Sequence, residues 1–145
     1  GIHRKQEEVE IVVPAGIENG EMIRLSGGGE AVAGGVAGDL YIKMHVKPDA
    51  HFHKDGPNLL MNLPVKLSDA LLGKRYTIST LDGDIVVVIP AGVTHGELLR
   101  VKGKGVPVSS SGKRGDLLIK VGITLPAKLS KEARQLVEEL RKEGL

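Results

Sequence analysis

An internal repeat constrains the fold of this chain more than any other feature. Residues 14–25 read Pro-Ala-Gly-Ile-Glu-Asn-Gly-Glu-Met-Ile-Arg-Leu, and residues 90–101, which begin 76 positions later, read Pro-Ala-Gly-Val-Thr-His-Gly-Glu-Leu-Leu-Arg-Val. Each copy follows a run of mostly β-branched residues, at 9–13 and 85–89, and leads into a glycine-rich loop and then Gly-Asp-Leu. Such runs between glycine-rich turns are typical of short strands. The repeat therefore predicts two homologous β-subdomains in tandem.

The second copy carries an additional front section, residues 58–80. Ser68 and Asp69 are placed to cap a short helix over residues 70–72, and Gly73 is placed to end it. The residues before this helix alternate between apolar and polar, which predicts a half-buried strand. The apolar positions of that strand are Leu59, Met61, Leu63, Val65 and Leu67.

The first copy lacks such a front section. In the second copy a strand through Tyr76 and Ile78 leads into Leu-Asp-Gly-Asp at 81–84, a strong signal for a two-residue hairpin turn. Only 13 residues precede Pro14. We therefore expect the matching front of the first copy to lie upstream of this chain, and we expect an unpaired strand edge at residues 9–13.

The carboxyl-terminal residues change to a helical pattern. Ser130 is placed to act as an N-cap, and Gly144 to end the helix. Ala133, Leu136, Val137 and Leu140 form one apolar stripe between them. The sequence thus predicts a mostly β fold, with two tandem homologous β-sandwich-like subdomains, short helices and a C-terminal amphipathic helix. We expect the parts to span residues 1–49, 50–127 and 128–145.

Composition excludes several classes of function. The chain has no cysteine, so neither a disulfide framework nor a thiolate zinc site is possible. Tyr41, Phe52 and Tyr76 are the only aromatic residues, and the formal net charge is +2. A nucleic-acid partner is therefore not expected, because single-strand binding uses aromatic stacking and a basic groove. No apolar run approaches the roughly 20 residues that a membrane helix needs.

Motifs that often mark chemistry have simpler interpretations here. The loop Ser-Gly-Gly-Gly-Glu at 26–30 lies between two predicted strands, so it indicates a hairpin turn and not a phosphate-binding loop. His51 and His53 share a face of an extended segment, but zinc requires at least three protein ligands. Asp39 and Asp116 each follow a glycine at a strand start and are interpreted as turn formers that accept loop N–H bonds. No arrangement predicts an enzyme.

Phe52 is the only phenylalanine, and it lies in the otherwise polar, turn-like segment 50–56. Two interpretations stay open. The ring can fill the junction between the subdomains, or it can form a wall of an exposed apolar groove. The second arrangement is how a protein without catalytic groups would hold exposed hydrophobic segments.

Motifs along essentially the whole chain resemble the C-terminal region of DnaJ-type co-chaperones, and they occur in the same order. They are Pro-Ala-Gly-Ile-x-x-Gly-x-x-Ile-Arg-Leu at 14–25, Gly-Asp-Leu-Tyr-Ile at 38–42, His-Phe-His-Lys-Asp-Gly at 51–56, Ala-Leu-Leu-Gly at 70–73 and Gly-Lys-Gly-Val-Pro at 103–107. The resemblance is to the class whose zinc module interrupts the first subdomain. It implies that this chain is truncated just before that subdomain's second half. It also implies that zinc binds only in the upstream module and that this chain holds no cofactor.

The resemblance also implies a function. Such a region binds unfolded or partly folded client polypeptides, within a cytoplasmic co-chaperone that delivers them to a seventy-kilodalton heat-shock chaperone. Carried onto this sequence, the resemblance assigns Val9, Ile11 and Phe52 to the client groove. It assigns Leu136 and Leu140 to dimerisation through the terminal helix. The alternative is a scaffold that gives dimerisation and spacing with little client binding of its own.

Overall fold

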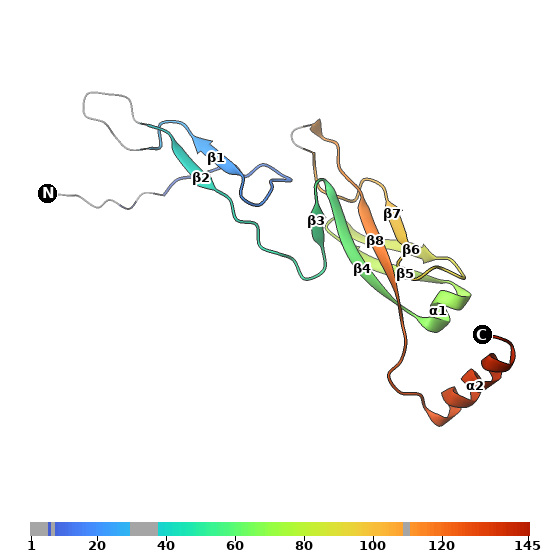
Figure 1. Cartoon of the computed structure of the whole chain (residues 1–145). Coiled ribbons are helices and arrows are strands. Elements are labelled where there is room, and N and C mark those ends of the chain that lie inside the picture. The colour runs from blue at the N-terminus through green and yellow to red at the C-terminus, as the bar shows by residue number, and fades with distance from the viewer. Residues whose placement is uncertain (1–5, 7, 30–37, 109–110) are drawn as a thin grey trace. The chain divides into compact units, whose positions relative to one another are not determined.

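The computed structural model describes residues 6, 8–29, 38–108 and 111–145 (Figure 1). Strands dominate this part of the chain, and a short helix and a longer C-terminal helix accompany them, which confirms the predicted fold class. The elements are β1 (Met22–Leu25), β2 (Leu40–Lys43), β3 (His53–Asp55), β4 (Asn58–Lys66), α1 (Leu67–Leu72), β5 (Lys74–Thr80), β6 (Gly83–Ile89), β7 (Leu98–Val101), β8 (Leu117–Thr124) and α2 (Lys131–Lys142).

The strands form one four-stranded sheet, in the order β3-β4-β8-β7, and two antiparallel pairs, β1-β2 and β5-β6. The chain divides into two compact units, Gly1–Met61 with Leu99–Ile119 and Asn62–Leu98 with Lys120–Leu145. The largest fully buried side chains belong to β4, β6 and β8. They are Val65, Ile89, Leu117, Ile119 and Val121.

The two copies of the repeat have the same local structure, as predicted. β1 and β7 occupy equivalent positions of the repeat, and each follows a turn at a glycine with positive φ, 88° at Gly20 and 85° at Gly96. The Gly20 N–H donates to the Met44 carbonyl oxygen at 2.7 Å, and the Gly96 N–H donates to the Val121 carbonyl oxygen at 2.8 Å. Equivalent donors thus reach equivalent acceptors in the two copies of the repeat.

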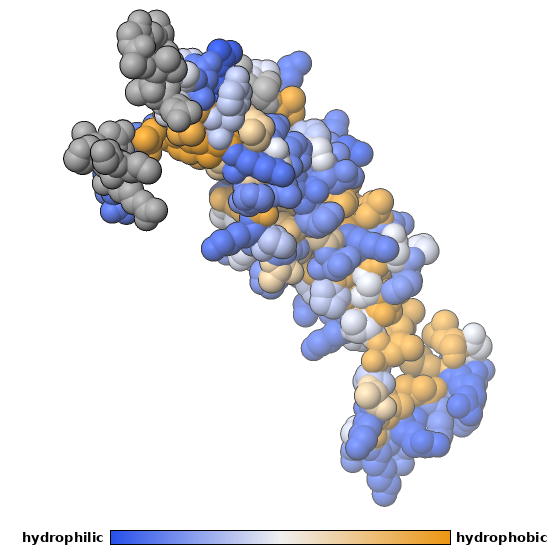
Figure 2. Space-filling model, turned by 60° about the vertical axis from the view of Figure 1, so that its left-hand side comes forward, coloured by the Kyte–Doolittle hydropathy of each residue, from blue (hydrophilic) through white to orange (hydrophobic). Residues whose placement is uncertain are grey.

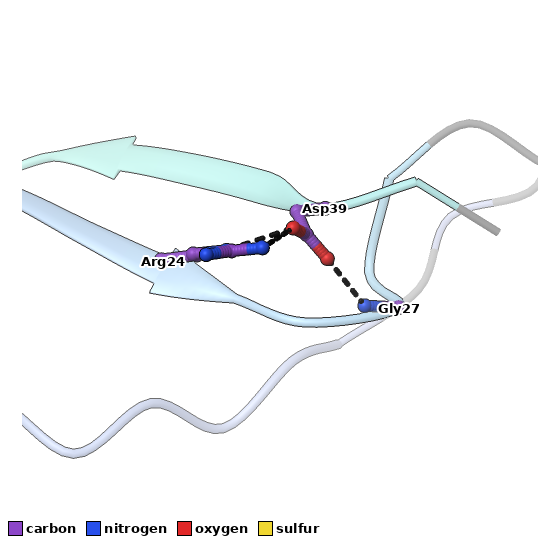
Figure 3. A network of polar contacts seen from close by, with 3 residues as sticks. All are labelled: Arg24, Gly27 and Asp39. Carbon is purple, nitrogen blue, oxygen red and sulfur yellow. Dashed lines mark hydrogen bonds and ion pairs between the residues drawn. The ribbon is translucent and has the colours of Figure 1, made fainter.

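A side-chain network joins the two strands of the first copy. Arg24 on β1 donates from Nε to Oδ2 of Asp39 at 2.7 Å, and the two side chains form an ion pair. The other carboxylate oxygen of Asp39 accepts the backbone N–H of Gly27 at 3.2 Å (Figure 3). One carboxylate therefore joins β1, the loop that follows it and the start of β2.

The second copy repeats this network. Arg100 pairs with Asp116, whose Oδ1 accepts the backbone N–H of Gly103 at 3.0 Å. The Gly103 hydrogen bond, and after it the Arg100 guanidinium, hold the pKa of Asp116 below its ordinary value. Both repeat aspartates accept loop N–H groups, so their interpretation as turn formers is confirmed.

Two local predictions were wrong. Residues 8–13 carry no strand, although β6 covers the equivalent run in the second copy. β6 pairs along its length with β5, whereas no described strand pairs with residues 8–13. Helix α1 begins at Leu67, after an N-cap at Lys66 that makes no side-chain cap bond, and not at a Ser68 or Asp69 cap. The Asp69 carboxylate instead accepts the hydroxyl of Tyr76 at 2.6 Å.

The ends of both helices follow the sequence more closely. Gly73, with φ of 82°, ends α1 as predicted. The Ser130 side chain accepts the backbone N–H of Ala133 at 3.0 Å, which confirms it as the N-cap of α2. Gly144 follows α2 with φ of 85°.

Candidate functional site

The residues predicted to bind clients lie in two separate segments. Val9 and Ile11 belong to the irregular stretch 8–13, where Val9 is 48% exposed and Ile11 is partly buried. Val12, in the same stretch, is 87% exposed. Phe52, also partly buried, immediately precedes β3. Among the described residues, no strand pairing joins Phe52 to residues 8–13.

The backbone at Phe52 is fixed by a short turn. Oδ1 of Asp49 accepts the backbone N–H of His51 at 2.8 Å and that of Phe52 at 3.0 Å. These two hydrogen bonds, in that order, lower the pKa of the Asp49 carboxyl group. The turn therefore holds the Phe52 backbone in place, and His51 and His53 on either side are exposed.

The first copy also presents an apolar sheet face that the sequence did not predict. In the β1-β2 pair, Ile23 lies opposite Ile42, and Leu25 lies opposite Leu40. These four side chains, which we name the open sheet face, are all only partly buried. β2 pairs with β1 on one edge, and no described strand pairs with its other edge.

The equivalent face of the second copy is buried on β8, whereas Leu99 and Val101 on β7 are partly buried like Ile23 and Leu25. Leu117 and Ile119 on β8 correspond to Leu40 and Ile42, and both have 0% exposure. β8 has β7 on one edge and β4 on the other. The backbone N–H of Leu59 on β4 donates to the Asp116 carbonyl oxygen at 2.9 Å. Within the described residues, β2 has no such neighbour, so the first copy differs from the second in an uncovered face and an unpaired edge.

A comparison of the two copies could have found this face from sequence. The alternation in β4 predicts a strand beside the second copy, and the first copy contains no equivalent of β4 within this chain. The unequal fronts predicted an open edge for that reason. They placed the edge at residues 9–13, however, whereas the described edge that lacks the neighbour present in the second copy belongs to β2.

A second apolar surface lies within the unit that contains both helices. A groove of about 650 Å³ runs between α1, the segment after β8 and α2. Figure 2 shows hydrophobic surface around this hollow at the lower end of the picture and hydrophilic surface on the outer side of α2. The lining residues are Lys66, Leu67, Ser68, Leu71, Thr124, Leu125, Pro126, Leu129, Ala133, Val137 and Leu140.

The two residues predicted to dimerise differ in their positions on α2. Leu140 lines the groove and is 37% exposed. Leu136 is 67% exposed and lies beside polar side chains of the same helix, Glu132, Gln135, Glu138 and Glu139. The helix therefore presents Leu140 to the groove and Leu136 to a more polar surface.

Other kinds of site find no support in the described part of the chain. No three His, Asp or Glu side chains there lie close enough together to hold a metal ion. None of the described helices has the length and apolar character to cross a membrane. The described geometry is one of apolar surfaces and an unpaired strand edge.

Comparison with known proteins agrees with this geometry. The family model described as DnaJ C terminal domain matches residues 2–126. The chain is 44% identical over 140 residues to proteins named Chaperone protein DnaJ from Brucella canis, Brucella suis and Brucella melitensis. The alignment covers 95% of this chain and 37% of each relative, so the chain spans just over a third of their length.

Proposed function

The chain belongs to the family of DnaJ C-terminal domains, and on that premise we propose that it binds unfolded or partly folded polypeptides in an extended conformation. The first copy of the repeat is the binding region. Val9, Ile11 and Phe52 are the proposed contacts, and the open sheet face adds further apolar surface beside an unpaired edge.

One observation carries the proposal, namely the difference in exposure between equivalent strands. Leu40 and Ile42 are partly buried, whereas their equivalents Leu117 and Ile119 are fully buried. The copies share the same turns and the same Arg-Asp network, so the difference lies in β4, which pairs with β8 and has no described counterpart beside β2. The first copy therefore retains apolar surface that an added strand would cover.

The physical basis of binding is the addition of a strand to an edge. Backbone N–H and C=O groups of an extended peptide would pair with β2, which gives affinity for many sequences. Apolar side chains at alternate peptide positions would cover the open sheet face, which gives a preference for hydrophobic segments. Such binding is reversible and needs no nucleophile, metal or cofactor, so we propose a binding module and not an enzyme.

The wider role follows from the family. We propose that the chain acts within a cytoplasmic co-chaperone that delivers clients to a seventy-kilodalton heat-shock chaperone. The relatives named Chaperone protein DnaJ support this role, and their chains are much longer than the part matched here. Stimulation of the partner's ATPase is not assigned to this chain, because the chain contains none of the His-Pro-Asp motif that the family uses for it.

A scaffold that dimerises is the second candidate. The groove beside α2 favours it, since Leu140 and Val137 face apolar residues there and leave open volume. A helix from a second copy of the chain would bury this surface. The two functions are compatible, because the groove and the open sheet face involve different strands and helices.

Peptide binding tests the proposal directly. The fluorescence anisotropy of a labelled peptide with apolar residues at alternate positions should rise on titration with the chain. Ile42→Ala should weaken binding roughly tenfold, because about 1–2 kcal/mol of apolar contact is lost. Lys43→Ala, on the opposite face of the same strand, is the matched control and should change little. Raising the salt concentration should change this affinity little, whereas it would weaken binding through phosphate contacts steeply.

A further inference from the structure

The first copy contains an Asn-Gly pair at the turn before β1. Oδ1 of Asn19 accepts the backbone N–H of Val46 at 2.8 Å, and the backbone N–H of Gly20 donates to the Met44 carbonyl oxygen at 2.7 Å. Gly20 has a φ of 88°, and no atom would lie within 4 Å of an added Cβ. Asn19 is exposed and Gly20 is partly buried, and two hydrogen bonds hold the pair to the residues that follow β2.

An asparagine followed by glycine can undergo an internal reaction. The deprotonated amide nitrogen of the glycine attacks Cγ of the asparagine side chain, and the bond from Cγ to the side-chain nitrogen breaks. That nitrogen takes up a proton and leaves as ammonia, so a cyclic imide remains. Water then opens the imide at one of its two carbonyl carbons and gives aspartate or isoaspartate. Glycine favours the attack because no Cβ hinders the approach.

The fold holds both reacting groups in hydrogen bonds to other residues. The Gly20 nitrogen keeps its proton in the bond to Met44, and the Asn19 carboxamide is oriented by the Val46 N–H. Attack requires both hydrogen bonds to open, which happens only as the first copy opens locally. We propose that Asn19 is a deamidation site that the folded first copy keeps latent and that local opening of β1 and β2 exposes.

The second copy provides an internal contrast. His95 occupies the position equivalent to Asn19, and its Nδ1 accepts the backbone N–H of Ile123 at 2.9 Å. The Gly96 N–H makes the same bond as the Gly20 N–H, to Val121. An imidazole has no carboxamide carbon for the glycine nitrogen to attack. The same hydrogen bonds are therefore maintained in both copies, but only the first copy can react at this turn.

Deamidation of Asn19 would alter the turn before β1. Isoaspartate places an extra carbon atom in the main chain, so the Gly20 and Val46 hydrogen bonds could not both keep their geometry. Aspartate would preserve the main chain but add a negative charge next to Glu18. Modification at Asn19 therefore records past opening of the first copy and, as isoaspartate, hinders its closing.

The experiment follows deamidation in the whole chain. Samples are incubated at mildly alkaline pH, in buffer and in denaturing urea, then digested and analysed by mass spectrometry for the conversion of the Asn19 amide to acid. The peptide that contains Asn58, which precedes leucine, is the internal control. The rate of deamidation at Asn19 should be at least roughly ten times lower in buffer than in urea, because two hydrogen bonds must open first. Asn58 should remain unreacted on the same timescale.

Two variants strengthen the test. Asp39→Asn weakens the Arg24 network of the first copy and should raise the rate in buffer, whereas Asp116→Asn, the matched change in the second copy, should not. Asn19→His introduces the second copy's residue and should abolish the signal while circular dichroism is unchanged. Equal rates in buffer and in urea would overturn the proposal, as would the absence of reaction in urea or equal effects of the two Asp variants.

Discussion

Nε of Arg24 donates to Oδ2 of Asp39 at 2.7 Å, and this contact joins β1 to the residue that precedes β2. The second copy of the repeat contains the same pair of residues, Arg100 and Asp116, in the same arrangement. The antiparallel pair and its closing network are therefore properties of the repeat itself. What differs between the copies is the covering of the apolar face, and this difference is the basis of the proposed function.

The first prediction compares equivalent isoleucines. Ile119→Ala should lower the free energy of unfolding by about 2–5 kcal/mol, because Ile119 is fully buried and its truncation leaves a cavity. Ile42→Ala should cost about 1 kcal/mol, because much of that side chain already contacts water. Urea unfolding of both variants checks this. Equal losses would show that Ile42 is part of a closed core and that the open sheet face does not exist.

The second prediction concerns acid. The pKa of Asp116 is lowered from its ordinary value of 3.8 by the Gly103 N–H and by Arg100. A group whose folded pKa is depressed contributes stability that is present above the unfolded value and is lost as the pH falls through the folded pKa. Asp116→Asn should therefore lower the melting temperature at neutral pH and make the acid side of the stability profile less steep. An unchanged acid profile in this variant would contradict the assignment.

The third prediction concerns Phe52. Phe52→Ala should weaken binding of an apolar peptide by about 1–3 kcal/mol, or roughly tenfold to a hundredfold, and leave the fold largely intact. His53→Ala, at the exposed neighbouring residue, is the control and should bind normally. Melting temperature and peptide affinity are measured on the same samples. A large loss of melting temperature with unchanged affinity per folded molecule would make Phe52 a structural residue only.

The fourth prediction concerns α2. Leu140→Asp should weaken self-association, measured by sedimentation equilibrium, because a charge would enter the apolar groove. Leu136→Asp tests the other predicted dimerisation residue, which is largely exposed, and should also weaken it if the interface covers the whole apolar stripe. Gln135→Asp is the control. A wild-type chain that remains monomeric at high concentration would contradict the scaffold candidate.

Local sequence signals predicted much of the fold. The alternation at Leu59, Leu63 and Val65 marks β4, and all three side chains are buried. Ser130 caps α2 because its side chain can satisfy an N–H of its own helix, an interaction within four residues. Repeats, caps and hairpin turns are short-range features, so a single sequence contains the information that they require.

Predictions that depend on distant partners were less accurate. Asp69 was predicted to cap α1, but its carboxylate accepts the Tyr76 hydroxyl from β5 instead. Residues 9–13 have the composition of a strand, but a strand also needs a neighbour, and none is present in the described part of the chain. The open sheet face also depends on a distant partner, because β4 pairs with β8 and no described strand lies in the same place beside β2.

Amide hydrogen exchange, with and without a saturating apolar peptide, tests the central claim most directly. If an extended client adds to the first copy, protection should increase at the backbone N–H groups of β2 and around Phe52. The equivalent strand of the second copy, β8, should exchange at the same rate with and without peptide, since its two edges are already paired. Protection confined to β8 and β7, or no change in β2 at saturation, would contradict the proposal that the first copy binds the client.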